Sequence, residues 1–227
     1  MSRRLENKKV FVTQDNDFMD PAICDLFSNE GAQVQSKADP VPFDNSFHHY
    51  QKDIGEIDIL IANLAHNPCT ARVQEIKDDD WQNLFNVMVH PLMTLVRHFA
   101  PRMAERGGGK IVAITSAAPL RGISGSTAYC AARGAQNAFI KACGLEFASH
   151  NVQINAVAQN YVSNPEYFPD TLLETERFQT HLRRNVPINR VAKASESAEL
   201  ALFLASENSD FIVGQIIPFS GGWATNT

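Results

Sequence analysis

A serine, a tyrosine and an arginine stand at fixed spacing in the middle of the chain, as Ser116, Tyr129 and Arg133. Tyr129 and Arg133 are four residues apart in a stretch of helix-forming residues, so they share one face of the expected helix. A cation beside a phenol favours the phenolate, and a nearby hydroxyl can hold a substrate oxygen while its proton leaves. The three residues therefore predict a general base, its activator and a substrate clamp.

The elements that position these residues are visible in the hydrophobic pattern. Apolar strands alternate with amphipathic helices, and this order is typical of a parallel sheet covered by helices on both faces. We therefore expect an α/β fold with a Rossmann-like, doubly wound parallel sheet, in which Ser116 follows a strand and the other two residues lie on a long helix. Strands are predicted over residues 9–13, 32–35, 57–62, 110–114, 152–157 and 215–219, and helices over 20–31, 79–105, 126–149, 172–184 and 195–206.

Three stretches depart from the regular pattern. Pro91 is expected to kink the helix over residues 79–105, because proline has no N–H to donate to the preceding turn. Residues 37–55 are rich in Pro, Asp and His, and are expected to hold one short helix and a degenerate strand. Residues 158–171, rich in aromatic residues and proline, are expected to form a loop at the end of the fifth strand.

Length, net charge and cysteine spacing exclude several classes of protein for this chain. The chain has 227 residues, 44% of them hydrophobic, which is enough for one packed domain over residues 1–227. Its net charge is −5 and its 20 Lys and Arg residues are scattered, which argues against a nucleic-acid partner. No apolar run reaches about 18 residues, so no membrane span is expected. The cysteines lack metal-ligand spacing, which is typical of a reduced, cytoplasmic protein without a bound metal; they are Cys24, Cys69, Cys130 and Cys143.

The turn after the first strand, over residues 13–20, is where a dinucleotide-binding fold cradles pyrophosphate. Such a turn needs glycine, because only a backbone without side chains can approach the phosphates closely. Here the turn contains no glycine, and Asp15, Asp17 and Asp20 would place negative charge where phosphates sit. Phe18 would fill space that a cofactor needs. The sequence therefore predicts a pocket closed to NAD(P) and a protein that uses no cofactor.

The order of elements, the Ser-x12-Tyr-x3-basic pattern and the Gly221-Gly222 ending make nearly the whole chain resemble the short-chain dehydrogenases/reductases. Two features differ from the oxidoreductases of that superfamily: Arg133 stands where they carry lysine, and the turn reads Thr-x4-Phe at Thr13 and Phe18. Both features resemble the halohydrin dehalogenases, a cofactor-independent branch with the patterns Ser-x12-Tyr-x3-Arg and Thr-x4-Phe/Tyr-x-Gly. Asp20 replaces the last glycine of the second pattern.

This resemblance implies a reaction, in which a vicinal haloalcohol becomes an epoxide with release of halide and a proton. In reverse, halide, azide, cyanide or nitrite would open an epoxide. Tyr129, as phenolate, would take the hydroxyl proton, Arg133 would stabilise that phenolate, and Ser116 would hold the substrate oxygen. The alkoxide would then displace the halide from the neighbouring carbon. The resemblance places the halide and the substrate beside Phe18, Gln159, Asn160, Tyr161, Tyr167 and Phe168.

The resemblance also implies an assembly and a route for the proton. Helices equivalent to residues 79–105 and 126–149 pack subunits together in this superfamily, so a homotetramer is expected. Some relatives have an aspartate after the residue equivalent to Asn63, close to the arginine, where this chain has Leu64. Leucine cannot relay a proton, so either His66 or bulk water would take that part.

Two other functions stay open from the sequence. The first is an NAD(P)-dependent reductase with a degenerate cofactor turn, and the second is a non-catalytic, ligand-binding scaffold on the same fold. The acidic turn argues against the reductase, and the intact Ser116, Tyr129 and Arg133 pattern argues against a scaffold. Halide release from a haloalcohol is expected of neither alternative, so it separates both from the dehalogenase.

Overall fold

A computed structural model of the chain describes residues 3–14, 19–67, 69–165 and 167–225. Six parallel strands form one sheet in the order β2-β1-β3-β4-β5-β6. The chain runs outward from β1 to β2 on one side and from β3 to β6 on the other, which is the doubly wound arrangement that the sequence predicts, and the α/β fold is confirmed. The strands are β1 (Lys9–Thr13), β2 (Gln33–Lys37), β3 (Ile59–Asn63), β4 (Gly109–Ser116), β5 (Val152–Gln159) and β6 (Ile216–Phe219).

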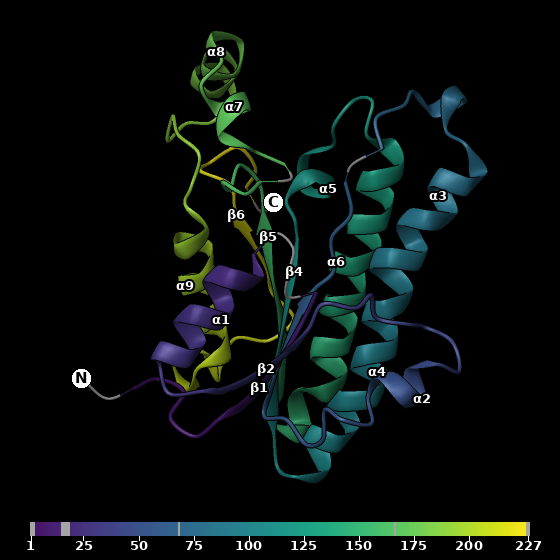
Figure 1. The fold of residues 1–227 in the computed structure, drawn as a ribbon, viewed down its shortest axis with the longest axis vertical. Helices are drawn as coiled ribbons and strands as arrows, with labels where there is room; N and C mark the ends of the chain where they lie inside the picture. The colour runs from purple at the N-terminus through teal and green to yellow at the C-terminus, as the bar shows by residue number, and fades with distance from the viewer. Residues whose placement is uncertain (1–2, 15–18, 68, 166, 226–227) are drawn as a thin grey trace.

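Helices cover both faces of this sheet (Figure 1). Helices α1 (Asp20–Asn29) and α9 (Ala194–Ala205) pack on one face, with Phe27 and Leu202 fully buried against the strands. Helices α4 (His90–Glu105) and α6 (Thr127–Phe147) pack on the other. Strand β3 between them is buried on both sides, which explains its continuous apolar run over residues 59–62 rather than an alternating pattern.

Shorter helices complete the fold. The sequence predicted a short helix within residues 37–55, and α2 (Phe47–Tyr50) confirms it, but the degenerate strand expected there is absent from residues 38–58. Within the loop expected over residues 158–171, the chain already begins a helix at Asp170. The remaining short elements are α3 (Asp78–Leu84), α5 (Ala118–Arg121), α7 (Asp170–Leu173), α8 (Glu176–Asn185), and the 3-10 turns Val73–Glu75, Ala148–His150 and Glu207–Ser209.

The long helix predicted over residues 79–105 is divided. A π-helical turn, Phe85–Val89, lies between α3 and α4, and Pro91 stands in the first turn of α4. Proline has no N–H for the carbonyl four residues earlier, so regular α-helical bonding cannot pass through this point. The expected proline kink is therefore a widened turn just before the proline, and such turns often occur at functional sites.

An excursion of the chain, residues 163–191, contains α7 and α8 and stands above the carboxyl ends of β5 and β6 (Figure 1). Its two ends meet where Val162 pairs with Ala192 in an isolated parallel bridge. Two backbone hydrogen bonds close this base: Ala192 N–H donates to the Tyr161 carbonyl at 2.8 Å, and Ser163 N–H donates to the Ala192 carbonyl at 2.8 Å. We call residues 163–191 the α7–α8 arm.

Neither a membrane span nor a metal cluster is found in the described part of the chain. None of the helices there is long and apolar enough to cross a bilayer. No three His, Cys, Asp or Glu side chains among those residues gather as metal ligands would. All four cysteines are free thiols.

Candidate active site

The predicted trio comes together at the carboxyl ends of the central strands. Ser116 ends β4, while Tyr129 and Arg133 lie one turn apart near the start of α6. Arg133 Nε donates a hydrogen bond to the Tyr129 hydroxyl oxygen at 3.0 Å, and the guanidinium lies 5.3 Å from the centre of the Tyr129 ring. All three side chains are buried, with Arg133 only 3% exposed. The predicted contact between the Tyr129 and Arg133 side chains is present.

The Arg133 guanidinium is held by neutral groups only. One of its terminal nitrogens donates to the Leu64 carbonyl at 2.8 Å and to the Gln136 side-chain oxygen at 2.9 Å. None of the ion pairs among the described residues includes Arg133. Burial alone would lower the pKa of Arg133, but the Tyr129 and Tyr167 hydroxyls raise it, so the side chain keeps its charge. The site therefore contains a buried positive charge without a carboxylate partner.

The Ser116 hydroxyl is oriented by the backbone that follows it. Ala118 N–H donates to Ser116 Oγ at 3.1 Å, which uses an acceptor position of the hydroxyl and leaves its proton free to donate. The strand end is fixed from two sides, because Asn137 Nδ2 donates to the Ser116 carbonyl at 3.2 Å and Ala117 N–H donates to the Gln159 carbonyl at 3.1 Å. Ser116 can thus donate a hydrogen bond to the oxygen of a bound substrate.

A cavity of about 560 Å³ opens beside these residues. This volume is in the range of small-molecule sites. The predicted halide and substrate residues line it together with the trio, with the exception of Phe18, which lies outside the described residues. The predicted residues that the cavity brings together are Ser116, Tyr129, Arg133, Gln159, Asn160, Tyr161, Tyr167 and Phe168.

Tyr167 occupies a position that the sequence did not indicate. Its hydroxyl donates to the His66 carbonyl at 2.5 Å and lies beside the Tyr129 hydroxyl and the Arg133 guanidinium. Burial, and the neighbouring Tyr129, raise the pKa of Tyr167, so this phenol keeps its proton. Tyr167 thus packs against the base from the side of the loop after β3. The His66 ring, a candidate for proton relay, points elsewhere, to the Asn67 carbonyl and to Asn83.

Sequence reasoning missed several other residues in or next to the cavity. Thr115 precedes Ser116, is 2% exposed, and its hydroxyl has no hydrogen-bond partner among the described residues. Gln136 holds Arg133 and, through its amide nitrogen, donates to the Met88 carbonyl of the π-helical turn at 2.8 Å. Arg177 and His181 reach the cavity from α8. Only the one-turn spacing of Gln136 from Arg133 on α6 was a signal visible in the sequence.

Comparison with known proteins assigns the family. A sequence-family model described as enoyl-(acyl carrier protein) reductase matches residues 22–224, which includes the trio. The chain belongs to the short-chain dehydrogenase/reductase family. Dehydrogenase/reductase SDR family member 4 of Oryctolagus cuniculus is 28% identical over 168 residues, which cover 74% of this chain and 64% of that protein. A 3-oxoacyl-(acyl-carrier-protein) reductase of Thermotoga maritima is 28% identical over 247 residues, covering 96% of this chain and 98% of that protein.

Solved structures of this family superpose closely on the chain. A dehalogenation enzyme does so with a TM-score of 0.87 at 30% identity, covering 97% of this chain and 100% of that one. A halohydrin dehalogenase bound to ethyl (2S)-oxiran-2-ylacetate has a TM-score of 0.86 at 22% identity, with 96% and 98% covered. A gluconate 5-dehydrogenase from Burkholderia cenocepacia, in complex with NADP and tartrate, has a TM-score of 0.85 at 22% identity, with 98% and 97% covered. The two likenesses at 22% identity show the shared fold alone.

NAD(P) is the cofactor that this family implies, and the described residues of its turn do not fit it. Gln14 takes the place where a glycine would let pyrophosphate approach the backbone. It has a left-handed φ of 56°, and its buried side-chain oxygen accepts a hydrogen bond from Ala65 N–H at 3.2 Å. A side chain therefore fills the space between the ends of β1 and β3. Residues 15–18, with Asp15, Asp17 and Phe18, lie outside the described part, as does the side chain of Asp20.

Proposed function

We propose that this protein is a cofactor-independent halohydrin dehalogenase, which converts vicinal haloalcohols to epoxides with release of halide and a proton. The observation that carries the proposal is the buried Arg133 guanidinium, whose Nε donates to the Tyr129 hydroxyl oxygen at 3.0 Å. An opposite charge nearby stabilises a buried charge, and the ionisable groups that contact Arg133 among the described residues are tyrosine hydroxyls, which supply that charge as a phenolate.

The order of events follows from the hydrogen bonds of the site. Ser116 donates its free proton to the substrate oxygen, and Tyr129 as phenolate takes the hydroxyl proton of the same oxygen. The O–H bond breaks and the alkoxide forms; its electron pair then makes the new C–O bond as the C–halogen bond breaks and halide leaves. Tyr129 returns the proton to solvent. A well-positioned base contributes about 10²–10⁴-fold to such a step.

The leaving halide needs hydrogen-bond donors on the far side of the carbon under attack. The Val162 N–H donates to none of the described residues, and it follows Tyr161, whose left-handed φ of 55° turns the chain at the cavity wall. The Thr115 hydroxyl is a second donor without a partner among those residues. Together with the Gln159 amide, these groups support an anion site at the ends of β4 and β5, and Phe18 remains a proposed member of it.

The test is halide release from 1,3-dichloro-2-propanol without added NAD(P). The wild-type protein is expected to release chloride in step with proton release. Tyr129→Phe keeps the ring packing but removes the base, so turnover should fall at least about 100-fold. Bromide binding, followed by Trp fluorescence, should survive in this variant. A folded wild-type protein that releases no halide from a panel of haloalcohols would overturn the proposal.

A reductase is the second candidate, because reductases are among the relatives of this chain. That reaction would need the nicotinamide cofactor to occupy the turn where Gln14 reaches Ala65. NADPH binding in the micromolar range, with consumption of NADPH on a small ketone and no halide release, would favour the reductase over the dehalogenase.

A further inference from the structure

The outer end of the active-site cavity, away from the trio, is built by the α7–α8 arm. Arg177, Phe178 and His181 of α8 line the same cavity as Ser116 and Tyr129. Between the two ends the wall is apolar, with Phe168 packed against Phe178 at 5.9 Å between ring centres. The cavity thus has two polar ends that are separated by an apolar middle.

The charged side chains among the described residues that line this cavity all have the same sign. Among its described lining residues, the charged side chains are Arg133 at the inner end and Arg177 at the outer end, and none is acidic. Arg177 forms no ion pair with any described residue, in contrast to Arg4 and Arg190, whose guanidinium groups each contact glutamates. A cavity with low-dielectric walls and a single sign of charge concentrates ligands of the opposite sign. The outer end therefore favours an anionic group.

A buried donor lies beside His181, which is one turn from Arg177 on α8. The Tyr161 side chain is 7% exposed and its hydroxyl lies 2.8 Å from His181 Nε2. Asn185 Nδ2 donates to the His181 carbonyl at 2.9 Å, which identifies it as the amide nitrogen, and it lies 3.3 Å from His181 Nδ1. In the tautomer in which His181 Nδ1 accepts from Asn185, Nε2 carries the hydrogen and donates to the Tyr161 oxygen. The Tyr161 proton is left for an acceptor in the cavity.

The titration of Tyr161 agrees with this assignment. Burial raises the pKa of Tyr161, and the nearby Arg121 offsets only part of that effect. The hydroxyl therefore keeps its proton at neutral pH and acts as a donor. A neutral donor and a cation that line one cavity can together bind a carboxylate.

We propose that the outer end of the cavity binds a carboxylate carried by the substrate, and that carboxylate-bearing vicinal haloalcohols are the substrate class. This inference rests on the proposed dehalogenase function. The Tyr161 O–H donates to one carboxylate oxygen, the Arg177 guanidinium pairs with the other, and the apolar middle takes the carbon chain. For 4-chloro-3-hydroxybutanoate, the products are oxiran-2-ylacetate, chloride and a proton; the C–Cl bond breaks and a C–O bond forms.

The test compares acids with their neutral esters. We would measure kcat/KM of chloride release for 4-chloro-3-hydroxybutanoate and 6-chloro-5-hydroxyhexanoate, each beside its ethyl ester. The two lengths probe the distance between the trio and Arg177. The wild-type protein is expected to prefer at least one acid over its ester about 10-fold or more, as charge-assisted hydrogen bonds predict.

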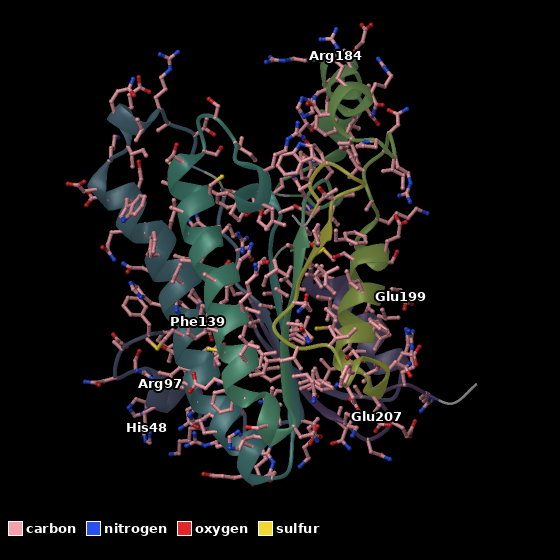
Figure 2. All side chains as sticks on the ribbon, turned by 180° about the vertical axis from the view of Figure 1, so that it is seen from behind. His48, Arg97, Phe139, Arg184, Glu199 and Glu207 are labelled. Atoms are coloured by element: carbon pink, nitrogen blue, oxygen red, sulfur yellow. The ribbon has the colours of Figure 1, made fainter. Side chains whose placement is uncertain are left out.

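Two substitutions in α8 distinguish a direct contact between Arg177 and the carboxylate from the general electrostatic effect of positive charge on this helix. Arg177→Gln should lower the acid-to-ester preference about 5- to 10-fold, mainly through KM. Arg183→Gln removes the same charge, but Arg183 donates to Thr180 on the outside of the arm at 3.0 Å, so it should keep the preference. Figure 2 shows the outer tip of this arm at Arg184.

Each outcome has a distinct meaning. Equal or better turnover of the esters at both lengths would overturn the carboxylate inference and leave the dehalogenase function standing. An equal loss of preference in Arg177→Gln and Arg183→Gln would also overturn it, because the effect would then come from net charge alone. Chloride release from neither acids nor esters would overturn the dehalogenase function itself, and the inference with it.

Discussion

At the scale of single residues, Arg133 shows what an arginine can do that a lysine cannot. Its Nε contacts the Tyr129 oxygen while a terminal nitrogen contacts the Leu64 carbonyl and Gln136. The planar fork lets one side chain hold the base and tie α6 to the end of β3 at once. The arginine at position 133, where related oxidoreductases have lysine, therefore changes the geometry of these contacts as well as the charge.

Arg133→Lys should lower kcat about 10-fold or more, because a single ammonium group cannot reach Tyr129 and the Leu64 carbonyl together. The measurement is chloride release at saturating haloalcohol, with circular dichroism to check folding. Arg184→Lys, at the outer tip of the α7–α8 arm, is the matched control and should leave kcat unchanged (Figure 2). Full activity in Arg133→Lys would show that charge alone is sufficient.

Some contacts of the candidate site could be predicted from residue spacing in the sequence, and others could not. The spacing of Ser116, Tyr129 and Arg133 predicted a contact that the structure contains, because helical periodicity fixes which side chains share a face. The places of Tyr167 and Arg177 depend on how the α7–α8 arm folds over the strand ends, and no local pattern encodes that path. The sequence named Tyr167 as a halide- or substrate-binding residue, which stays a prediction; its place beside the Tyr129 hydroxyl was not foreseen.

At the scale of elements, α6 is the helix that places the site, and it packs unusually close to its neighbours. At Gly144 a β-carbon would lie 2.5 Å from the Gly214 Cα and 3.0 Å from the Ile154 carbonyl, so only glycine fits there. At Gly134, in the same helix, the nearest atom to such a carbon would be Pro119 Cβ at 3.5 Å, an ordinary contact. Close packing at one end of α6 thus fixes the position of Tyr129 at the other.

This pair of glycines gives opposite expectations for the same substitution. Gly144→Ala should lower the free energy of unfolding by about 1–3 kcal/mol or more, because the backbone atoms that it meets cannot move aside. Gly134→Ala should raise it by about 0.5–1 kcal/mol, because alanine favours the helix. Urea unfolding of both variants is the measurement. A neutral Gly144→Ala would mean that α6 packs less closely than the structure shows.

The elements themselves were largely predictable, and the exceptions have physical causes. Long apolar runs bounded by glycine or polar residues predicted the strands, because both faces of a parallel strand are buried. The division of the helix before Pro91 was not predictable in form, since a missing N–H disturbs the preceding turn without fixing how that turn rearranges. The strand expected within residues 37–55 failed because its polar and proline-rich sequence forms no continuous ladder.

At the scale of the whole molecule, a histidine on the α4 face of the sheet makes the stability of the fold sensitive to acid. On the α4 face, His98 packs edge-on against Phe47 and Phe99, at 5.3 Å and 4.7 Å between ring centres. Burial, with a smaller effect from Arg102, lowers the pKa of His98 to about 4. Between pH 4 and the ordinary pKa of about 6.5, the unfolded chain binds a proton that the folded protein does not. Stability contributed by neutral His98 is therefore lost as pH falls through this window.

His98→Gln should reduce the difference in Tm between pH 7 and pH 4.5, because glutamine cannot take up that proton in the unfolded state. The absolute Tm is expected to fall at both values, so the difference is the quantity that matters. His48→Gln, at an exposed position of α2, serves as control and should show the wild-type difference. An unchanged difference in His98→Gln would contradict the assignment of the acid sensitivity to His98.

The hydrogen bonds that join the two ends of the α7–α8 arm affect how the sequence of this protein can change. Because the arm leaves and re-enters at Val162 and Ala192, which already touch, its length and sequence can change while the ends stay joined. Doubling a loop that is closed in this way costs only about 0.6 kcal/mol. A single recombination event that exchanges this contiguous segment would change the outer end of the cavity and leave Ser116, Tyr129 and Arg133 in place, so the arm can be inherited or grafted as one unit.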